Sequence, residues 1–159
     1  MKINIGPYQE SEEHDPNFER QVEIEIDYYD TWNMDNTLAL IILPMLKQLK
    51  ETKHGVPCCM PAYDDDQYGD SEKTLEKASE QWNEIMDKMI WSFEQLCSDD
   101  WGESQFWIEK PKLRTKTVNG DTSVWKQAGN CDYEGLKAHN DRIQEGLDLF
   151  GKHFRSLWD

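Results

Sequence analysis

Three acidic side chains near the middle of the chain have a spacing that could bring them together on one helix face. Glu80, Glu84 and Asp87 are separated by four and three residues, and this spacing places side chains on the same side of an α-helix. Carboxylate oxygens are the ligands that hard divalent cations prefer. The three residues therefore define a possible metal site.

A solvent-exposed helix face is the simpler interpretation of these acids, and we favour it. All-helical nucleotide pyrophosphatases pair an ExxE motif with a later ExxD motif, whereas the ExxE of this chain, at Glu10 and Glu13, lies in a polar loop. Charged residues opposite an apolar stripe are normal in an amphipathic helix. We therefore expect no cofactor. A metal-dependent nucleotide-processing or nucleotide-binding protein, with a divalent cation at Glu80, Glu84 and Asp87, is kept as an alternative.

The segment 110–126 reverses the acidic character of the chain. It carries the cations Lys110, Lys112, Arg114, Lys116 and Lys126, the acid Asp121 and the ring of Trp125, with Trp107 just before it. Positive charge beside an aromatic ring can bind an acidic partner, a nucleotide or single-stranded nucleic acid. Alternatively, the cations pair with the protein's own acids and keep an edge strand from aggregating. The candidate binding residues are Lys112, Arg114, Lys116 and Trp125.

Two further places offer candidate binding residues. One place is the start of the first expected helix, where Asp30, Trp32 and Asp35 are found. Helix N-termini favour anions, although the carboxylate of Asp35 would compete with a bound anion. Trp91 falls off the main apolar stripe of its expected helix, where it could anchor a partner or a second packing layer.

The overall charge restricts the classes of partner. The 159 residues include 17 Lys and Arg against 32 Asp and Glu, which gives a net charge of −15 at pH 7. This charge repels duplex nucleic acid and anionic membranes, so it disfavours direct binding to either. We expect a protein partner instead.

Composition predicts one folded domain inside a cell. Aromatic residues make up 11% of the chain, which is too many large rings for a disordered protein.

Four cysteines without a CxxC pair are expected to be free thiols. The N-terminus MKINIGPY lacks the charged and apolar regions of a secretory signal, and no apolar run approaches the roughly 20 residues of a spanning helix. A cytoplasmic location is expected.

The pattern of apolar residues predicts an α+β fold. KINIG and QVEIEID alternate apolar and polar residues, as half-buried strands do. Helices are expected at about 36–54, 71–97 and 132–157, and a β-hairpin at 105–126 would turn at Asn119-Gly120. The three helices would pack with a small antiparallel sheet formed by the N-terminal strands and the hairpin.

Pro44 interrupts the most apolar segment of the chain. Leu40 and Leu43 make a second side of the expected helix apolar, so we expect its first half to be the buried centre of the fold. Proline lacks a backbone N–H and crowds the carbonyl four residues earlier, which predicts a kink at Pro44. The kink would direct the polar second half toward solvent.

Four stretches of the sequence resemble a known group of proteins. They are KINIGPY, YDTWNMDNTLALIILPMLKQLKETKHGVP, DKMIWSFEQL and LFGKHFRSLWD. Together they are similar to a family of small proteins of unknown function encoded by tailed bacteriophages. The resemblance covers the N-terminal segment, the first two helices and the C-terminus, and it implies a phage origin without implying an activity.

A phage origin and a strongly acidic surface lead to one main functional expectation. The protein would act without catalysis by binding a host or phage macromolecule, as inhibitors of host factors or of defence proteins do. Its surface carboxylates would take the place of the phosphates that a nucleic-acid-binding partner normally contacts. The alternatives are the metal-dependent nucleotide-processing or nucleotide-binding protein described above and a structural component of the virion.

Overall fold

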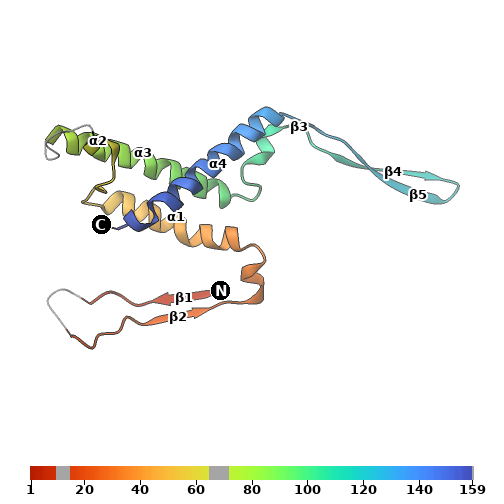
Figure 1. The fold of residues 1–159 in the computed structure, drawn as a ribbon. Coiled ribbons are helices and arrows are strands. Elements are labelled where there is room, and N and C mark those ends of the chain that lie inside the picture. The colour runs from red at the N-terminus through yellow and green to blue at the C-terminus, as the bar shows by residue number, and fades with distance from the viewer. Residues whose placement is uncertain (10–14, 65–71, 159) are drawn as a thin grey trace. The chain divides into compact units, whose positions relative to one another are not determined.

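The computed structural model describes residues 1–9, 15–64 and 72–158. The chain forms two compact units, residues 1–38 and 39–159, and each is described by itself. The predicted α+β class is confirmed, because three long helices occur together with small antiparallel sheets (Figure 1). No helix formed by the described residues is long and apolar enough to cross a membrane.

The first unit contains a two-stranded antiparallel sheet. Strand β1 (Lys2–Ile5) pairs with β2 (Val22–Glu25), so that Ile3 lies opposite Ile24 and Ile5 lies opposite Val22. All residues of both strands are exposed, which contradicts the predicted half-burial. The apolar side chains of both strands keep 39% to 59% of their surface accessible, so the described residues do not cover the apolar face of this sheet.

Helix α1 (Met34–Thr52) continues through Pro44 and neither begins nor ends there. Only Ala39 and Leu46 are buried, whereas Leu40 is 59% exposed and Met45 is 66% exposed. The prediction that its first half is the buried centre of the fold is therefore wrong. Apolar residues lie on several faces of α1, but only one narrow face packs into the core. The kink at Pro44 stays a prediction.

Helix α3 (Glu72–Leu96) supplies most of the core of the second unit. Its buried apolar side chains are Ala78, Trp82, Met86, Met89, Ile90, Phe93 and Leu96. They follow the three- and four-residue rhythm of the sequence and confirm the predicted stripe, with Leu75 as an exposed exception. A short helix, α2 (Pro61–Asp64), packs beside α3, where the backbone N–H of Ala62 donates to Gln81 Oε1 at 3.0 Å.

Helix α4 (Tyr133–His153) packs along α3 and ends in the 3₁₀ turn η3 (Phe154–Ser156). Its buried residues are His139, Ile143, Gly146 and His153. The apolar residues Leu136, Leu147 and Phe150 of the same helix are only partly buried, and Asn140 is exposed. The buried side is therefore displaced from the apolar pattern, because two imidazole rings and a glycine occupy the positions nearest α3.

Ion pairs connect the three long helices at the surface of this unit. Lys47 Nζ on α1 lies 2.7 Å from Glu94 Oε1 on α3, and Lys88 Nζ on α3 lies 2.6 Å from Glu145 Oε1 on α4. Exposed pairs of this kind contribute little, about 0–1 kcal/mol each. Apolar packing around α3 is therefore the main source of stability.

Four short strands of the second unit form two separate pairs. Strand β3 (Trp107–Glu109) pairs with β6 (Asn130–Cys131), and β4 (Lys112–Val118) pairs with β5 (Asp121–Gln127). The predicted turn at Asn119-Gly120 is confirmed, and both residues have the positive φ of a two-residue hairpin turn, 52° and 88°. The sheets formed by the described residues are two-stranded, so the single sheet expected from the N-terminal strands and the hairpin is not formed.

Candidate functional site

The β4–β5 hairpin has two faces with different chemistry. Cross-strand partners share a face and successive residues alternate between faces. Lys112, Arg114 and Lys116 therefore lie on one face, opposite Gln127, Trp125 and Ser123 respectively. The structure thus brings four of the sequence-predicted candidates together, and Lys112, Arg114, Lys116 and Trp125 are called the basic face below.

The other face of the hairpin is mainly apolar and hydroxyl-bearing. It carries Leu113, Thr115, Thr117, Thr122, Val124 and Lys126. The hydroxyl oxygens of Thr117 and Thr122 lie 3.0 Å apart, which indicates a hydrogen bond. Lys126 is thus separated from the other three strand cations, and Trp107 lies outside the hairpin in β3. One face therefore holds three cations together with Asp121, and the other face holds one cation.

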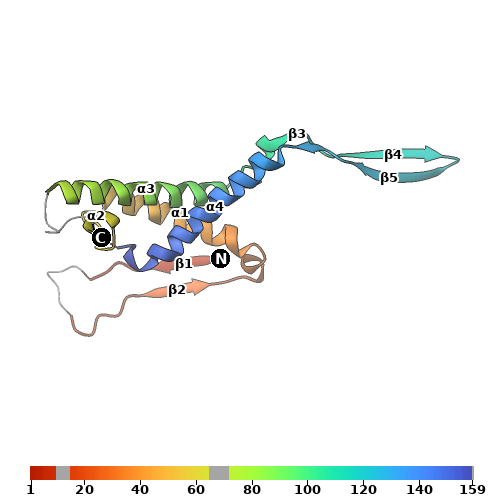
Figure 2. The same ribbon diagram turned by 45° about the horizontal axis from the view of Figure 1, so that its top comes forward.

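Both faces of the hairpin are open to solvent. Every residue of β4 and β5 is exposed, and Trp125 keeps 47% of its surface accessible. Figures 1 and 2 show the hairpin extending away from α3 and α4. Isolated two-stranded hairpins are only marginally stable in water. A partner that covered one face would therefore stabilise the hairpin as well as bind to it.

Neighbouring side chains contact two of the three cations of the basic face. Arg114 Nε donates to Gln127 Oε1 at 2.8 Å, on the same face. Lys112 Nζ lies 3.6 Å from Glu109 Oε1, just before the strand. The guanidinium of Arg114 carries other N–H donors besides Nε, so its bond to Gln127 orients the group without exhausting its donors.

Backbone hydrogen bonds fix the base of the hairpin to the helical part of the unit. The N–H of Asp132 donates to the carbonyl oxygen of Phe106 at 2.8 Å, beside the β3–β6 pair. The carboxylate of Asp132 then accepts the N–H of Gly135 at 2.9 Å and caps helix α4. This cap satisfies a donor of the first helical turn. The chain returning from the hairpin is thereby joined directly to α4.

A turn after α3 fixes the other end of the hairpin segment. Asp100 accepts the N–H of Gly102 at 3.1 Å and the N–H of Ser104 at 3.0 Å. Hydrogen bonding by Ser104, together with that of the Gly102 backbone, lowers the pKa of Asp100. The turn leads into the 3₁₀ helix η2 (Glu103–Phe106) and then into β3. It therefore positions the chain that enters the hairpin.

Trp91 is part of the packing between α3 and α4. Its ring lies 5.4 Å from the ring of His139, centroid to centroid, and Arg142 Cζ lies 3.7 Å above it. Phe106 contacts His139 from the other side, with the ring centroids 5.2 Å apart. The structure thus supports the second packing layer predicted for Trp91, and it places this residue at the base of the hairpin rather than on the basic face.

The remaining candidates, Asp30, Trp32 and Asp35, lie in the first unit. Asp30 Oδ2 lies 2.8 Å from the Met1 amine and accepts the N–H of Asp27 at 2.7 Å. The hydrogen bond to the amine is the main cause that lowers the pKa of Asp30, and it raises the pKa of the amine. Trp32 is 73% exposed and stacks on Tyr29 at 6.1 Å. Asp35 lies in the first turn of α1.

The acidic residues of α3 do not gather into a site. Glu80, Glu84 and Asp87 are exposed along the helix, and Asp87 is paired with Lys50 of α1. Among the residues that the structure describes, no three His, Cys, Asp or Glu side chains are grouped so that they could hold a metal ion. Glu80, Glu84 and Asp87 therefore form no metal-binding group in the described part of the chain.

The chain was also compared with known proteins. No protein-family model, curated protein or solved structure matches it. What the candidate site can do therefore follows from its own side chains. Lysine and arginine pair with phosphate or carboxylate, and tryptophan offers a flat apolar surface for stacking. This set of groups is suited to binding an anion.

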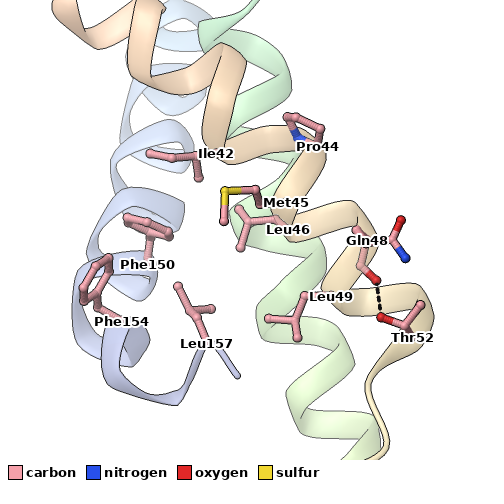
Figure 3. Close-up of a pocket in the computed structure, with 10 residues that line it drawn as sticks. All are labelled: Ile42, Pro44, Met45, Leu46, Gln48, Leu49, Thr52, Phe150, Phe154 and Leu157. Atoms are coloured by element: carbon pink, nitrogen blue, oxygen red, sulfur yellow. Dashed lines mark hydrogen bonds between the residues drawn. The ribbon is translucent and has the colours of Figure 1, made fainter. Parts of the chain in front are cut away.

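The second unit also contains an apolar groove that the sequence did not reveal (Figure 3). It has a volume of about 860 Å³ and lies between α1 and the end of α4 with η3. Its lining residues are Ile42, Pro44, Met45, Leu46, Gln48, Leu49, Thr52, Phe150, Phe154 and Leu157. Two of these apolar residues, Met45 and Phe154, are 66% and 63% exposed.

Proposed function

We propose that this protein is encoded by a phage and acts in the host cytoplasm without catalysis. It binds a polyanionic macromolecule of host or phage, and the basic face is its binding surface. The observation that carries this proposal is the convergence of Lys112, Arg114, Lys116 and Trp125 on one exposed face of the hairpin. A phage origin is supported by the sequence resemblance described above. A protein partner would have to be acidic where it meets this face.

The charge of the hairpin differs in sign from that of the whole chain. Strands β4 and β5 carry four cations and one acid, a net +3, whereas the chain carries −15. Opposite charge on a partner would accelerate its encounter with the hairpin and orient it. The acidic remainder of the chain would repel the same partner elsewhere, so contact should concentrate on the hairpin.

The length of the hairpin reduces the influence of the acidic helices. Each strand has seven residues, which corresponds to about 24 Å at roughly 3.4 Å per residue. The Debye length at physiological ionic strength is only about 8 Å. Lys116, about 14 Å along the strand from Lys112 at its base, is therefore largely screened from the helices, and it can attract a polyanion despite the net charge.

Two variants with equal net charge test whether the basic face binds polyanions. Lys112→Gln/Arg114→Gln/Lys116→Gln removes three positive charges from the basic face. Thr115→Glu/Thr117→Glu/Lys126→Gln changes the charge by the same amount on the opposite face. On a heparin column at low salt, we expect retention of the wild type, loss of retention for the first variant and substantial retention of the control. Equal elution of the two variants would contradict the proposal.

A further inference from the structure

We infer that the basic face binds single-stranded nucleic acid, with one base stacked on Trp125 and the phosphates paired with Lys112, Arg114 and Lys116. This inference rests on the proposed function and specifies the class of polyanion. It starts from the position of the ring within the row of cations. Trp125 is the direct cross-strand partner of Arg114, which is the middle cation of the three.

The exposed ring distinguishes a nucleic acid from an acidic protein surface. Carboxylates of a protein would pair with the three cations but would leave the face of Trp125 without a flat partner. An unpaired base fills that place, because bases stack on aromatic side chains while the backbone follows a positively charged surface. Trp125 is 47% exposed, so about half of its surface is accessible to a ligand. The combination of ring and cations thus favours nucleotides over carboxylates.

The spacing of the cations suits a single strand. Residues two apart in a strand are separated by about 6.7 Å, which equals roughly two stacked nucleotides at about 3.4 Å each. From Lys112 to Lys116 the row therefore covers about four nucleotides, at the lower end of known single-strand sites. The long side chains of lysine and arginine can adjust to small differences in phosphate position.

A single strand fits these features better than a duplex. In a duplex the base faces are stacked on one another, so Trp125 could not reach one without opening the helix. A duplex also carries one phosphate charge per roughly 1.7 Å of axis, which increases its repulsion from a chain of net charge −15. Only one face of the hairpin carries the row of cations, as expected for a site that follows one strand.

Fluorescence anisotropy on the full chain tests the inference with three labelled probes. These are a 12-nucleotide oligothymidylate, a 12-base-pair duplex and a peptide of 12 glutamates. We expect the oligothymidylate to bind most tightly. Three phosphate contacts predict a slope of about −2 for log K against log salt concentration. Binding should therefore weaken about 20-fold between 50 and 200 mM salt.

Substitutions at the ring and at the cations separate stacking from charge. Trp125→Ala should weaken oligothymidylate binding about 5-fold or more, because a stacked base contributes roughly 1–3 kcal/mol. Trp125→Phe keeps an aromatic face and should retain most of the affinity. Lys112→Gln/Arg114→Gln/Lys116→Gln should flatten the salt slope, whereas the opposite-face control should keep most of it. Amide exchange across β4 and β5 must show that each variant retains the hairpin.

The probes also separate failure of this inference from failure of the proposed function. Tighter binding of the glutamate peptide or the duplex would overturn the single-strand inference while leaving a polyanion-binding hairpin in place. Unchanged oligothymidylate affinity in both Trp125 variants would also overturn it. If none of the probes binds and the wild type is not retained on heparin, both the inference and the proposed function are wrong.

Discussion

His139 Nε2 lies 2.7 Å from the carbonyl oxygen of Trp101. Because a carbonyl can only accept, the imidazole donates this hydrogen bond and ties α4 to the turn that follows α3. Trp101 has a φ of 52°, a conformation that is rare for a bulky residue and costs about 1–3 kcal/mol. The hydrogen bond therefore helps to hold a strained turn at the base of the hairpin.

Replacing His139 should destabilise the protein. His139 is 8% exposed, and His139→Leu would remove the donor to the Trp101 carbonyl together with the ring contacts to Trp91 and Phe106. We expect a loss of about 1–3 kcal/mol in the free energy of unfolding, measured by urea denaturation. Asn140→Ala, at an exposed position on the same helix, is the control and should change stability by about 0.5 kcal/mol or less. Equal losses in the two variants would contradict the role assigned to His139.

His153 should make the fold sensitive to mild acid. The residue is 4% exposed, and its Nε2 has no hydrogen-bond partner among the described residues. Burial lowers the pKa of His153 below 6.5, and nearby Lys152 lowers it further. A lowered pKa means that the folded state favours the neutral ring. Its contribution to stability is thus complete above pH 6.5 and is lost as the pH falls through the folded-state pKa.

Melting temperatures between pH 5 and pH 7 would measure this effect. His153→Phe keeps an aromatic ring against Trp82, whose centroid lies 5.5 Å from that of His153, and it removes the titrating group. We expect the variant to lose less stability than the wild type as the pH falls over this range. Lys152→Gln removes the smaller cause of the pKa shift and should have the smaller effect. Parallel curves for wild type and His153→Phe would show that His153 does not control acid sensitivity.

Two glycines of α4 should respond in opposite ways to alanine. A Cβ at Gly146 would lie 2.6 Å from the backbone oxygen of Lys88 and 2.0 Å from Ser92 Oγ, whereas a Cβ at Gly151 would have no neighbour within 4 Å. Gly146→Ala must therefore separate α3 and α4, and we expect a loss of about 1–3 kcal/mol. Gly151→Ala should gain up to about 1 kcal/mol from helix propensity. Thermal unfolding of both variants tests the helix contact, and a stable Gly146→Ala would contradict it.

Local chemistry made the hairpin predictable from the sequence. Asn-Gly is among the few residue pairs that readily adopt positive φ at two successive positions, so Asn119-Gly120 fixed the turn. The register of the strands then follows from the turn, and the alternation of side chains places Lys112, Arg114 and Lys116 on one face. Segment 105–126 was too wide an assignment, because Trp107–Glu109 pairs with β6 instead.

Tertiary contacts explain what the sequence could not predict. The apolar residues of α1 indicated burial on nearly all sides, but the pattern does not state how many neighbours a helix will have, and Leu40 and Met45 are exposed. A scale of hydrophobicity does not assign His139 and His153 to a core, although both rings pack against tryptophan. The apolar groove was missed because the apolar pattern does not state which apolar residues of α1 lack a neighbouring element.

The turn at Asn119-Gly120 offers a test of geometry that leaves every charge unchanged. Gly120 has a φ of 88°, and a Cβ at this position would have no neighbour within 4 Å. Gly120→Val therefore creates no clash with other residues, but a β-branched side chain strains this backbone conformation. Val118 and Asp121, which flank the turn as a cross-strand pair, should lose their register first.

We expect Gly120→Val to weaken retention on heparin without lowering the melting temperature of the helices. The physical reason is that the basic face exists only while the register holds Lys112, Arg114 and Lys116 beside Trp125. Amide exchange would report the opening of β4 and β5, and far-ultraviolet circular dichroism would report the helices. Asn119→Gly, which keeps a residue tolerant of positive φ and leaves the charge unchanged, is the control for the turn. If Gly120→Val opened the hairpin yet left retention unchanged, positive charge alone and not the ordered face would be responsible for binding.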